Sequence, residues 1–101
     1  MIFLYVTCKD EQEAERIAAH LLEKKVCACV NYHPIKSMYW WKGKIEKDNE
    51  YVLIIKTVEK HIIAVEQEVR HIHSYEVPCI AQIDVKRGNK LYADWIKECV
   101  I

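Results

Sequence analysis

The amino-acid sequence predicts an α+β fold with an antiparallel sheet, in one domain that spans residues 1–101. Short apolar runs of strand length alternate with two amphipathic stripes of helical period, and a third such stripe follows near the end. The predicted strand at residues 50–57 is apolar on both faces at its centre, whereas a half-exposed antiparallel strand alternates apolar with polar residues. Helices of so short a chain can cover only one of these faces. We therefore expect another copy of the chain to cover the second face.

The first two elements are a strand at residues 2–7 and a helix that begins after Asp10. Asp10 offers an N-cap, and a glutamate three residues later completes a capping-box pattern. The apolar stripe of the helix consists of Ala14, Ile17, Ala18, Leu21 and Leu22. The opposite face, which we expect to face water, carries Glu13, Arg16, His20 and Lys24.

A second strand is predicted at residues 26–32, followed by a long antiparallel ribbon at residues 37–57. Pro34 is expected to interrupt the chain between them, because proline cannot donate to a strand ladder. The ribbon is expected to turn at residues 47–49, where polar residues separate an aromatic outgoing arm from an apolar return arm. Gly43 then lies inside the outgoing arm, where glycine usually marks a bulge or a close backbone approach.

The remaining elements are a second helix at residues 59–73, a strand at residues 79–85 and a last helix that Asn89 can cap. If residues 26–46 count as one interrupted strand, the order is β-α-β-β-α-β with a helix appended. This is the split βαβ, or ferredoxin-like, arrangement, in which two helices cover one face of a four-stranded antiparallel sheet.

Composition limits the class of partner and the compartment. Fifteen basic and fifteen acidic residues cancel, so nothing favours nucleic acid or an anionic membrane as a partner. No apolar run approaches the roughly 20 residues that span a bilayer, and no signal-peptide pattern precedes the first strand. The five cysteines are an odd number, which indicates reduced thiols in the cytoplasm rather than a disulfide framework.

Four residues are candidate metal ligands: His73, Cys79, His71 and Cys29. Cys27 and Cys29 form a C-x-C on a predicted strand, with side chains on one face roughly 6.6 Å apart, which could hold a soft metal such as Cu(I). Equally, free cysteine often packs as a small buried hydrophobe. His71 and His73 can act together only if the helix has unwound by residue 72, and Cys79 is then close enough to join them. A histidine at a helix end is otherwise a cap or a hydrogen-bonding group, and the three other histidines are expected to face solvent.

A second set of residues could line a ligand cleft: Tyr39, Trp41, Glu50, Lys56, Tyr75 and Glu76. The aromatic members could instead fill a core or a subunit interface. Lys56 follows two isoleucines in an apolar strand and therefore needs a partner, for which Glu50 and Glu76 are the candidates. The chain carries no glycine-rich phosphate loop, nucleophile elbow or H-E-x-x-H motif, so we expect a protein that is not an enzyme and has no organic cofactor.

Several ordered motifs together closely resemble the CutA divalent-cation tolerance family. They are Ala28-Cys29-Val30-Asn31, Ser37-x-Tyr39-x-Trp41-x-Gly43-Lys44-Ile45, Glu50, Lys56-Thr57, His73-x-Tyr75-Glu76-Val77-Pro78 and Gly88-x-x-x-Tyr92-x-x-Trp95-Ile96. The resemblance runs nearly end to end. It implies a ferredoxin-like protomer in a tight homotrimer whose ribbons clasp neighbouring subunits, similar to the PII-type signalling proteins with their ligand sites between subunits. It also implies a link to tolerance of copper and other divalent metals, since some members bind copper.

The sequence departs from the family pattern at four positions. Lys9 and Ser74 stand where members often carry proline, and Val6 stands where some carry cysteine. Cys79 replaces a usual glutamate, which would favour Cu(I) or Zn(II) over Mg(II) in a cleft.

Three functions are compatible with these features. The first is a cytoplasmic trimer that binds a transition metal at subunit clefts. The second is a PII-like regulatory trimer that binds a small anion or metabolite near Lys56, Tyr39, Tyr75 and Glu50. The third is a scaffold whose trimer presents a surface to a partner protein.

Overall fold

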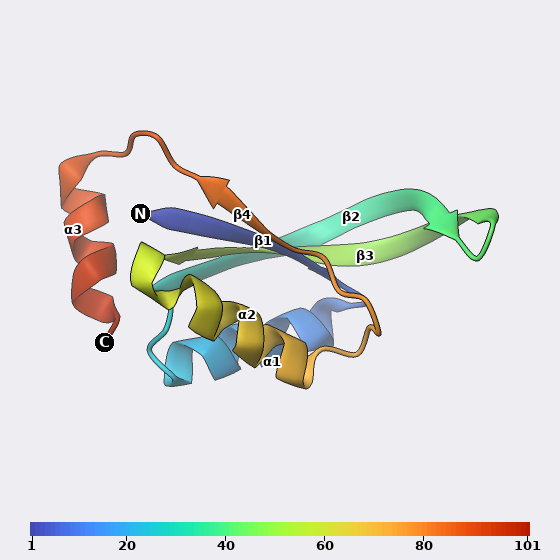
Figure 1. The fold of residues 1–101 in the computed structure, drawn as a ribbon, viewed down its shortest axis with the longest axis horizontal. Coiled ribbons are helices and arrows are strands. Elements are labelled where there is room, and N and C mark those ends of the chain that lie inside the picture. Colours follow the sequence, from blue (N-terminus) through green and yellow to red (C-terminus); the bar gives the residue numbers. More distant parts are fainter.

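The structure is a computed structural model that describes all residues from 1 to 101. Figure 1 shows a four-stranded sheet with two helices against one face and a third helix beyond one end of the sheet. The elements are β1 (Ile2–Cys8), α1 (Glu11–Glu23), β2 (Cys29–Trp41), β3 (Lys44–Thr57), a short 3-10 helix (Glu59–His61), α2 (Ile62–Ile72), β4 (Ile80–Asp84) and α3 (Lys90–Cys99). This order confirms the predicted α+β class and the predicted succession of helices and strands.

The sheet has the strand order β2-β3-β1-β4, and every neighbouring pair is antiparallel. The register places Thr7 of β1 opposite Val52 of β3, and Phe3 opposite both Lys56 and Ile83. Long-range pairing thus brings the N-terminal strand to the middle of the sheet. β4, which follows α2, lies against β1, whereas β2, which follows α1, lies at the opposite edge of the sheet against β3.

The hydrophobic core lies between the sheet and the helix pair α1 and α2. Its members share near-complete burial and come from all these elements: Leu4, Val6, Cys8, Ala14, Ile17, Ala18, Leu21, Val26, Cys27, Leu53, Ile55, Val65 and Val69. The predicted stripe of α1 is confirmed except for Leu22, which is exposed. Each fully buried Leu, Ile or Val contributes about 1.5–3 kcal/mol relative to an exposed one.

The turn of the ribbon lies at Lys42 and Gly43, so the turn predicted at residues 47–49 is wrong. Lys42 has φ +49° and Gly43 has φ +79°, and Trp41 pairs directly with Lys44 across this two-residue connection. Two central residues with positive φ are the signature of the type I′ turn, whose twist matches that of the flanking strands. Gly43 therefore makes the turn and not a bulge.

β2 runs without interruption through Pro34, which pairs with Tyr51, so the predicted break at this proline is also wrong. The physical reason is the position of β2 at the edge of the sheet, because a proline is tolerated on an edge strand. β2 begins at Cys29 rather than at residue 26, and Cys27 lies before it in the core. The two cysteines are therefore not neighbours on one face of a strand.

The expectation of a water-facing stripe on α1 fails at two residues. Glu13 is fully buried, although Arg16 and Lys24 of the same stripe are exposed. The side chain of His20 is 27% exposed, and its Nε2 lies 2.5 Å from Glu68 Oε2 of α2. His61, also expected to face solvent only, contacts the carbonyl oxygen of Ile101. These contacts tie α1 to α2 and the C-terminal residue to the 3-10 helix that precedes α2.

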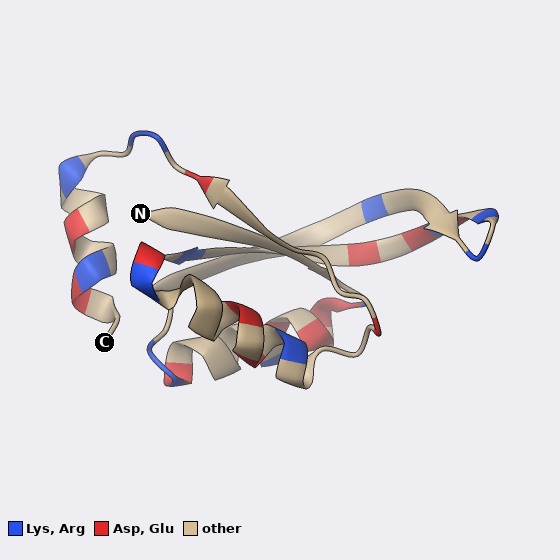
Figure 2. Ribbon diagram, viewed as in Figure 1, with Lys and Arg blue, Asp and Glu red and all other residues tan.

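Charged residues of both signs are spread over all three helices and the ribbon, and β1 carries none (Figure 2). No helix is long and apolar enough to cross a membrane.

Candidate functional site

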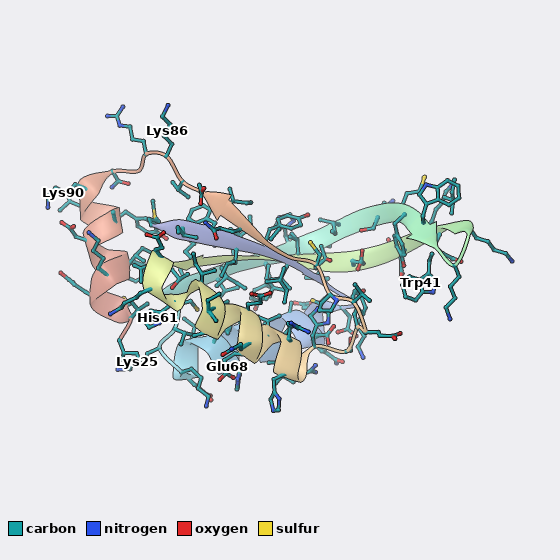
Figure 3. All side chains as sticks on the ribbon, viewed as in Figure 1. Lys25, Trp41, His61, Glu68, Lys86 and Lys90 are labelled. Carbon is teal, nitrogen blue, oxygen red and sulfur yellow. The ribbon has the colours of Figure 1, made fainter.

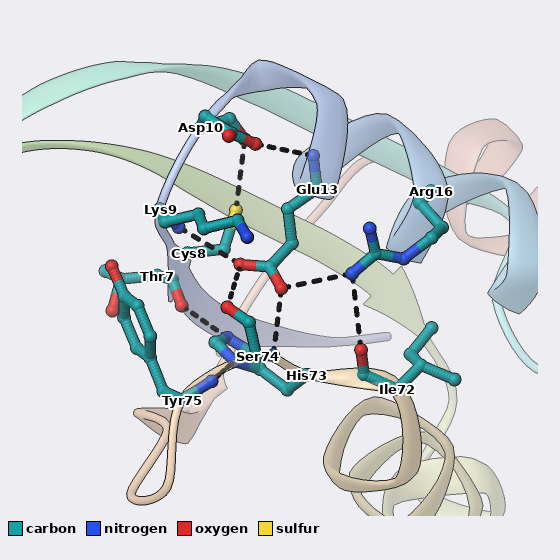
Figure 4. Close-up of polar contacts among 10 residues, drawn as sticks. All are labelled: Thr7, Cys8, Lys9, Asp10, Glu13, Arg16, Ile72, His73, Ser74 and Tyr75. Atoms are coloured by element: carbon teal, nitrogen blue, oxygen red, sulfur yellow. Dashed lines mark hydrogen bonds and ion pairs between the residues drawn. The ribbon is translucent and has the colours of Figure 1, made fainter.

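The buried carboxylate of Glu13 stands at the junction of β1, α1 and the segment after α2 (Figure 4). Asp10 begins α1 as predicted, because its Oδ1 accepts from the backbone N–H of Glu13 at 2.8 Å. The Glu13 carboxylate accepts from Lys9 N at 3.1 Å, from Arg16 Nη2 at 3.2 Å, and from Ser74 N and Oγ at 2.9 Å each. Four donors from three separate segments thus converge on one side chain.

The electrostatics of Glu13 follow from these contacts. Burial alone would raise the pKa of the carboxyl group, because it disfavours the charged form. The hydrogen bonds from Ser74 and Lys9 outweigh that effect and hold the pKa of Glu13 below its ordinary value. Glu13 is therefore ionised at neutral pH in spite of its burial.

His73 ends α2, and its imidazole uses both ring nitrogens. The backbone N–H of Tyr75 donates to Nδ1 at 3.0 Å, and Nε2 lies 2.8 Å from the carbonyl oxygen of Thr7. A backbone N–H can only donate, so Nδ1 must be unprotonated. A carbonyl can only accept, so Nε2 must carry the hydrogen. The two contacts together fix the Nε2–H tautomer of a neutral ring.

Tyr75 lies in the segment after α2, and its side chain reaches β3, where its hydroxyl donates to Glu50 Oε2 at 2.6 Å. Glu50 is only 8% exposed, and the Tyr75 ring lies against the His73 ring with centroids 4.9 Å apart. Burial and the Glu50 carboxylate raise the pKa of Tyr75 far above its usual range, so the phenol stays a hydrogen-bond donor. The structure therefore brings two of the predicted cleft residues, Tyr75 and Glu50, into direct contact.

An open cleft of about 450 Å³ adjoins this pair. Its lining consists of Lys9, Asp10, Pro34, Ile35, Lys36, Asn49, Glu50 and Tyr51. Glu50 thus belongs both to the cleft and to the contact with Tyr75. Two lysines and two carboxylates give the cleft charged groups of both signs.

The four candidate metal ligands do not gather within one chain. Cys29 pairs with Lys56, which is four strand positions from the Thr7 contact of His73, or about 13 Å along the sheet. Cys79 and His71 are exposed. No group of three or more His, Cys, Asp or Glu side chains in the chain is placed to hold a metal ion.

Lys56 has neither of its expected carboxylate partners. Its Nζ donates to the Tyr92 hydroxyl at 3.2 Å, and the same atom lies 5.5 Å from the Phe3 ring centroid and 5.3 Å from that of Tyr92. The aromatic rings attract the ammonium group through their π faces. Six strand positions, about 20 Å, separate Lys56 from Glu50, and Glu76 is exposed.

The two predicted cleft aromatics of the ribbon lie in different places. Tyr39 leans toward the site, because its hydroxyl lies 3.4 Å from Asp48 Oδ2, two positions before Glu50 on the same face of β3. Trp41 lies at the far tip of the ribbon (Figure 3), where Lys42 Nζ is 5.7 Å from its ring. Of the predicted cleft residues, the structure therefore brings together Tyr75, Glu50 and, next to them, Tyr39.

Sequence reasoning did not assign Glu13 and Ser74 to this site. The signal was present in the capping-box pattern, since a glutamate at the third helical position can turn its carboxylate back toward backbone donors. The helical-stripe argument placed the same residue on the wet face. No local pattern shows that the chain at Ser74 returns to cover it.

Residues 2–99 match the family described as "CutA1 divalent ion tolerance protein". The chain belongs to the CutA1 divalent ion tolerance family. The resemblance that the sequence motifs indicated is thereby confirmed.

Three CutA1 relatives illustrate the similarity. A divalent-cation tolerance protein CutA from Archaeoglobus fulgidus is 51% identical over 98 residues, which cover 97% of this chain and 96% of the relative. The structure described as the periplasmic divalent cation tolerance protein CutA of that organism has a TM-score of 0.97 at 50% identity and covers both chains fully. A chloroplastic protein CutA 1 from Oryza sativa subsp. japonica is 40% identical over 97 residues, or 95% of this chain, and this chain spans 55% of its length.

Proposed function

We propose that this protein acts in the tolerance of divalent cations, as a cytoplasmic homotrimer that binds transition-metal ions in clefts between its subunits. Membership of the CutA1 family supports the role in cation tolerance. All five cysteines are free, which fits a reducing compartment. The protomer is ferredoxin-like in this proposal, as supported by the β-α-β-β-α-β order and the strand order β2-β3-β1-β4.

The uncovered ribbon is the observation that carries the proposal of an assembly. Three large apolar side chains near its tip are strongly exposed: Trp40 at 73%, Met38 at 65% and Ile45 at 58%. Apolar residues gathered in this way on a soluble protein mark an interaction site. The ribbon extends past the helices, so no other helix or strand of the chain lies beside its tip (Figure 1). A neighbouring copy would supply the missing cover.

The chemistry of the metal site is proposed from the side chains that have a free coordinating atom. Cys29, Cys79 and His71 offer sulfur and imidazole ligands, and they lie apart on the surface of one chain. A site that uses two of them would be completed by a second chain. Sulfur and imidazole donors suit Cu(I) or Zn(II) better than the hard ions Mg²⁺ and Ca²⁺.

Native mass spectrometry of the reduced protein, before and after addition of Cu(I), Cu(II) or Zn(II), tests this proposal. We expect a trimer that takes up one ion per subunit and loses that uptake in Cys79→Ser. Cys99→Ser is the matched control, because Cys99 is half-buried in α3 and is expected to leave uptake unchanged. A monomer, or a trimer that stays free of metal at micromolar concentrations, would contradict the proposal.

The cleft beside Glu50 favours a second candidate, a PII-like regulatory trimer that binds a small anion or metabolite. Lys9 and Lys36 line this cleft and could hold an anionic group, while Asn49 offers an amide. Thermal-shift screening of anionic metabolites distinguishes this function, because a ligand of the folded state raises the melting temperature. Such a shift should disappear in Lys36→Ala and persist in the control Lys44→Ala, which lies at the ribbon turn.

A further inference from the structure

The contact between Ser74 and Glu13 is bidentate. The backbone N–H of Ser74 donates to Oε2 of Glu13, and its hydroxyl donates to Oε1, both at 2.9 Å. Two parallel hydrogen bonds to one carboxylate fix orientation as well as distance. Glu13 is fully buried and ionised, and each of its two oxygens accepts from two donors. The loss of one Ser74 donor would leave a buried charged oxygen with a single hydrogen bond, which is costly.

Ser74 lies between the two residues whose geometry defines the site. His73 precedes it and contacts Thr7, while Tyr75 follows it and contacts Glu50. The backbone N–H of Tyr75 reaches the imidazole Nδ1 only because the chain turns at Ser74. The orientation of the Ser74 peptide therefore decides whether His73 and Tyr75 can keep their contacts.

These contacts leave His73 with no free lone pair. A histidine binds a metal through an unprotonated ring nitrogen, and Nδ1 already accepts from Tyr75 while Nε2 carries a proton toward Thr7. Coordination by His73 would first require one of these two hydrogen bonds to break. The imidazole thus does not fit the role of a metal ligand in this conformation.

We propose that Glu13 and Ser74 form a clamp that positions His73 and Tyr75. Held in this way, His73 orients the Tyr75 backbone through Nδ1 and does not serve as a metal ligand. The clamp holds the imidazole in its Nε2–H tautomer and keeps the Tyr75 phenol on Glu50. This inference deepens the proposed function, on which it rests for the existence of the metal site, and leaves metal binding to Cys29, Cys79 and His71.

Nuclear magnetic resonance of the histidine ring nitrogens in the full-length protein tests the clamp, with Zn(II) alone as the probe. The wild-type protein should show two well-separated ¹⁵N signals for His73, with Nε2 protonated, and Zn(II) should leave both unchanged. Ser74→Ala removes the hydroxyl donor, so the two signals should move toward each other as the tautomers exchange, and they should then respond to Zn(II). Ser74→Thr keeps both donors and should restore the wild-type spectrum.

Glu13→Gln provides an independent test, because one carboxylate oxygen becomes an amide group that cannot accept. It should produce the same change in the His73 signals as Ser74→Ala. If Glu13→Gln does not fold, the comparison of Ser74→Ala with Ser74→Thr still tests the clamp. A lower melting temperature of Ser74→Ala with unchanged His73 signals would show that the contact between Ser74 and Glu13 only stabilises the fold. That result would overturn the clamp.

The failure of this inference is distinguishable from that of the proposed function. A shift of the His73 signals by Zn(II) in the wild-type protein would make His73 a ligand and overturn the clamp, while the metal function would stand. Absence of any Zn(II) or copper uptake would remove the metal function. The comparison of Ser74→Ala with Ser74→Thr would still decide whether the clamp sets the tautomer.

Discussion

Tyr75 and Glu50 lie 25 residues apart in the sequence, and the hydroxyl of one donates to the carboxylate of the other over 2.6 Å. The contact closes the segment after α2 onto β3. The carboxylate of Glu50 has no other hydrogen-bond partner in the chain, and the residue is only 8% exposed. This carboxylate therefore depends on a single phenol.

Tyr75→Phe should lower the free energy of unfolding by about 1.5–3 kcal/mol, the range for a hydrogen bond to a charged group. The cause is the desolvated Glu50 carboxylate, which the variant leaves without a donor. Chemical denaturation measures the effect. The control Tyr39→Phe removes an exposed hydroxyl that lies 3.4 Å from Asp48 and should cost less than about 0.5 kcal/mol. Equal losses in both variants would speak against a special role for the pair.

Gly43→Ala should destabilise the ribbon by about 1–2 kcal/mol, because an L-residue with a Cβ is strained at φ +79°. No neighbouring atom lies within 4 Å of the position of an added Cβ, so backbone strain is the only cause. Lys42→Asn should stabilise the protein, since Asn-Gly is the preferred pair of a type I′ turn. Thermal unfolding of both variants checks the two signs, and a stabilised Gly43→Ala would be inconsistent with this turn.

Acid should destabilise the folded protein through Glu13. The pKa of its carboxyl group is lower in the folded chain than its ordinary value of 4.5, so the unfolded state takes up the proton first as the pH falls. The stabilisation is complete above this ordinary value and is lost as the pH falls through the folded-state value. Urea denaturation between neutral pH and about pH 3 measures it. Glu13→Gln should flatten this dependence, whereas Glu23→Gln, at the exposed end of α1, should leave it unchanged.

Cys8 and Cys27 should resist alkylation in the native protein. Burial, with the Glu13 charge in the case of Cys8 and the neighbouring Cys29 in that of Cys27, raises the pKa of Cys8 to about 11 and that of Cys27 to about 12. The thiolate is the reactive form, and at about pH 8 only roughly one Cys8 thiol in a thousand and one Cys27 thiol in ten thousand would be ionised. Mass spectrometry after iodoacetamide treatment should find both unmodified, and urea should expose all five cysteines. Modification of Cys8 at its unfolded rate would refute this protection.

The parts of the fold that depend on local pattern were predictable from the sequence. Asp10 caps α1 through its own side chain, and the spacing of Ile17 and Leu21 places both in the core. In each case the decisive physical signal lies within a few residues.

The remaining features depend on contacts between distant segments. Glu13 is buried because Ser74 returns to it across 61 residues, which no helical stripe can show. Lys56 finds Tyr92 rather than a carboxylate because α3 packs at that end of the sheet. Pro34 is tolerated because β2 is an edge strand, and edge position is a property of the whole sheet.

The length of the ribbon has a consequence for how the chain unfolds. The molecule measures 45 × 26 × 21 Å, and its long axis follows β2 and β3 beyond the helices (Figure 1). Residues 44–49 of β3 are all exposed, whereas Glu50, Val52 and Leu53 are buried. The packing that resists local unfolding therefore ends within one strand. A two-stranded ribbon is marginally stable by itself. The amides of its tip should therefore exchange with solvent by fraying in a free protomer. The proposed assembly predicts that their protection rises with protein concentration.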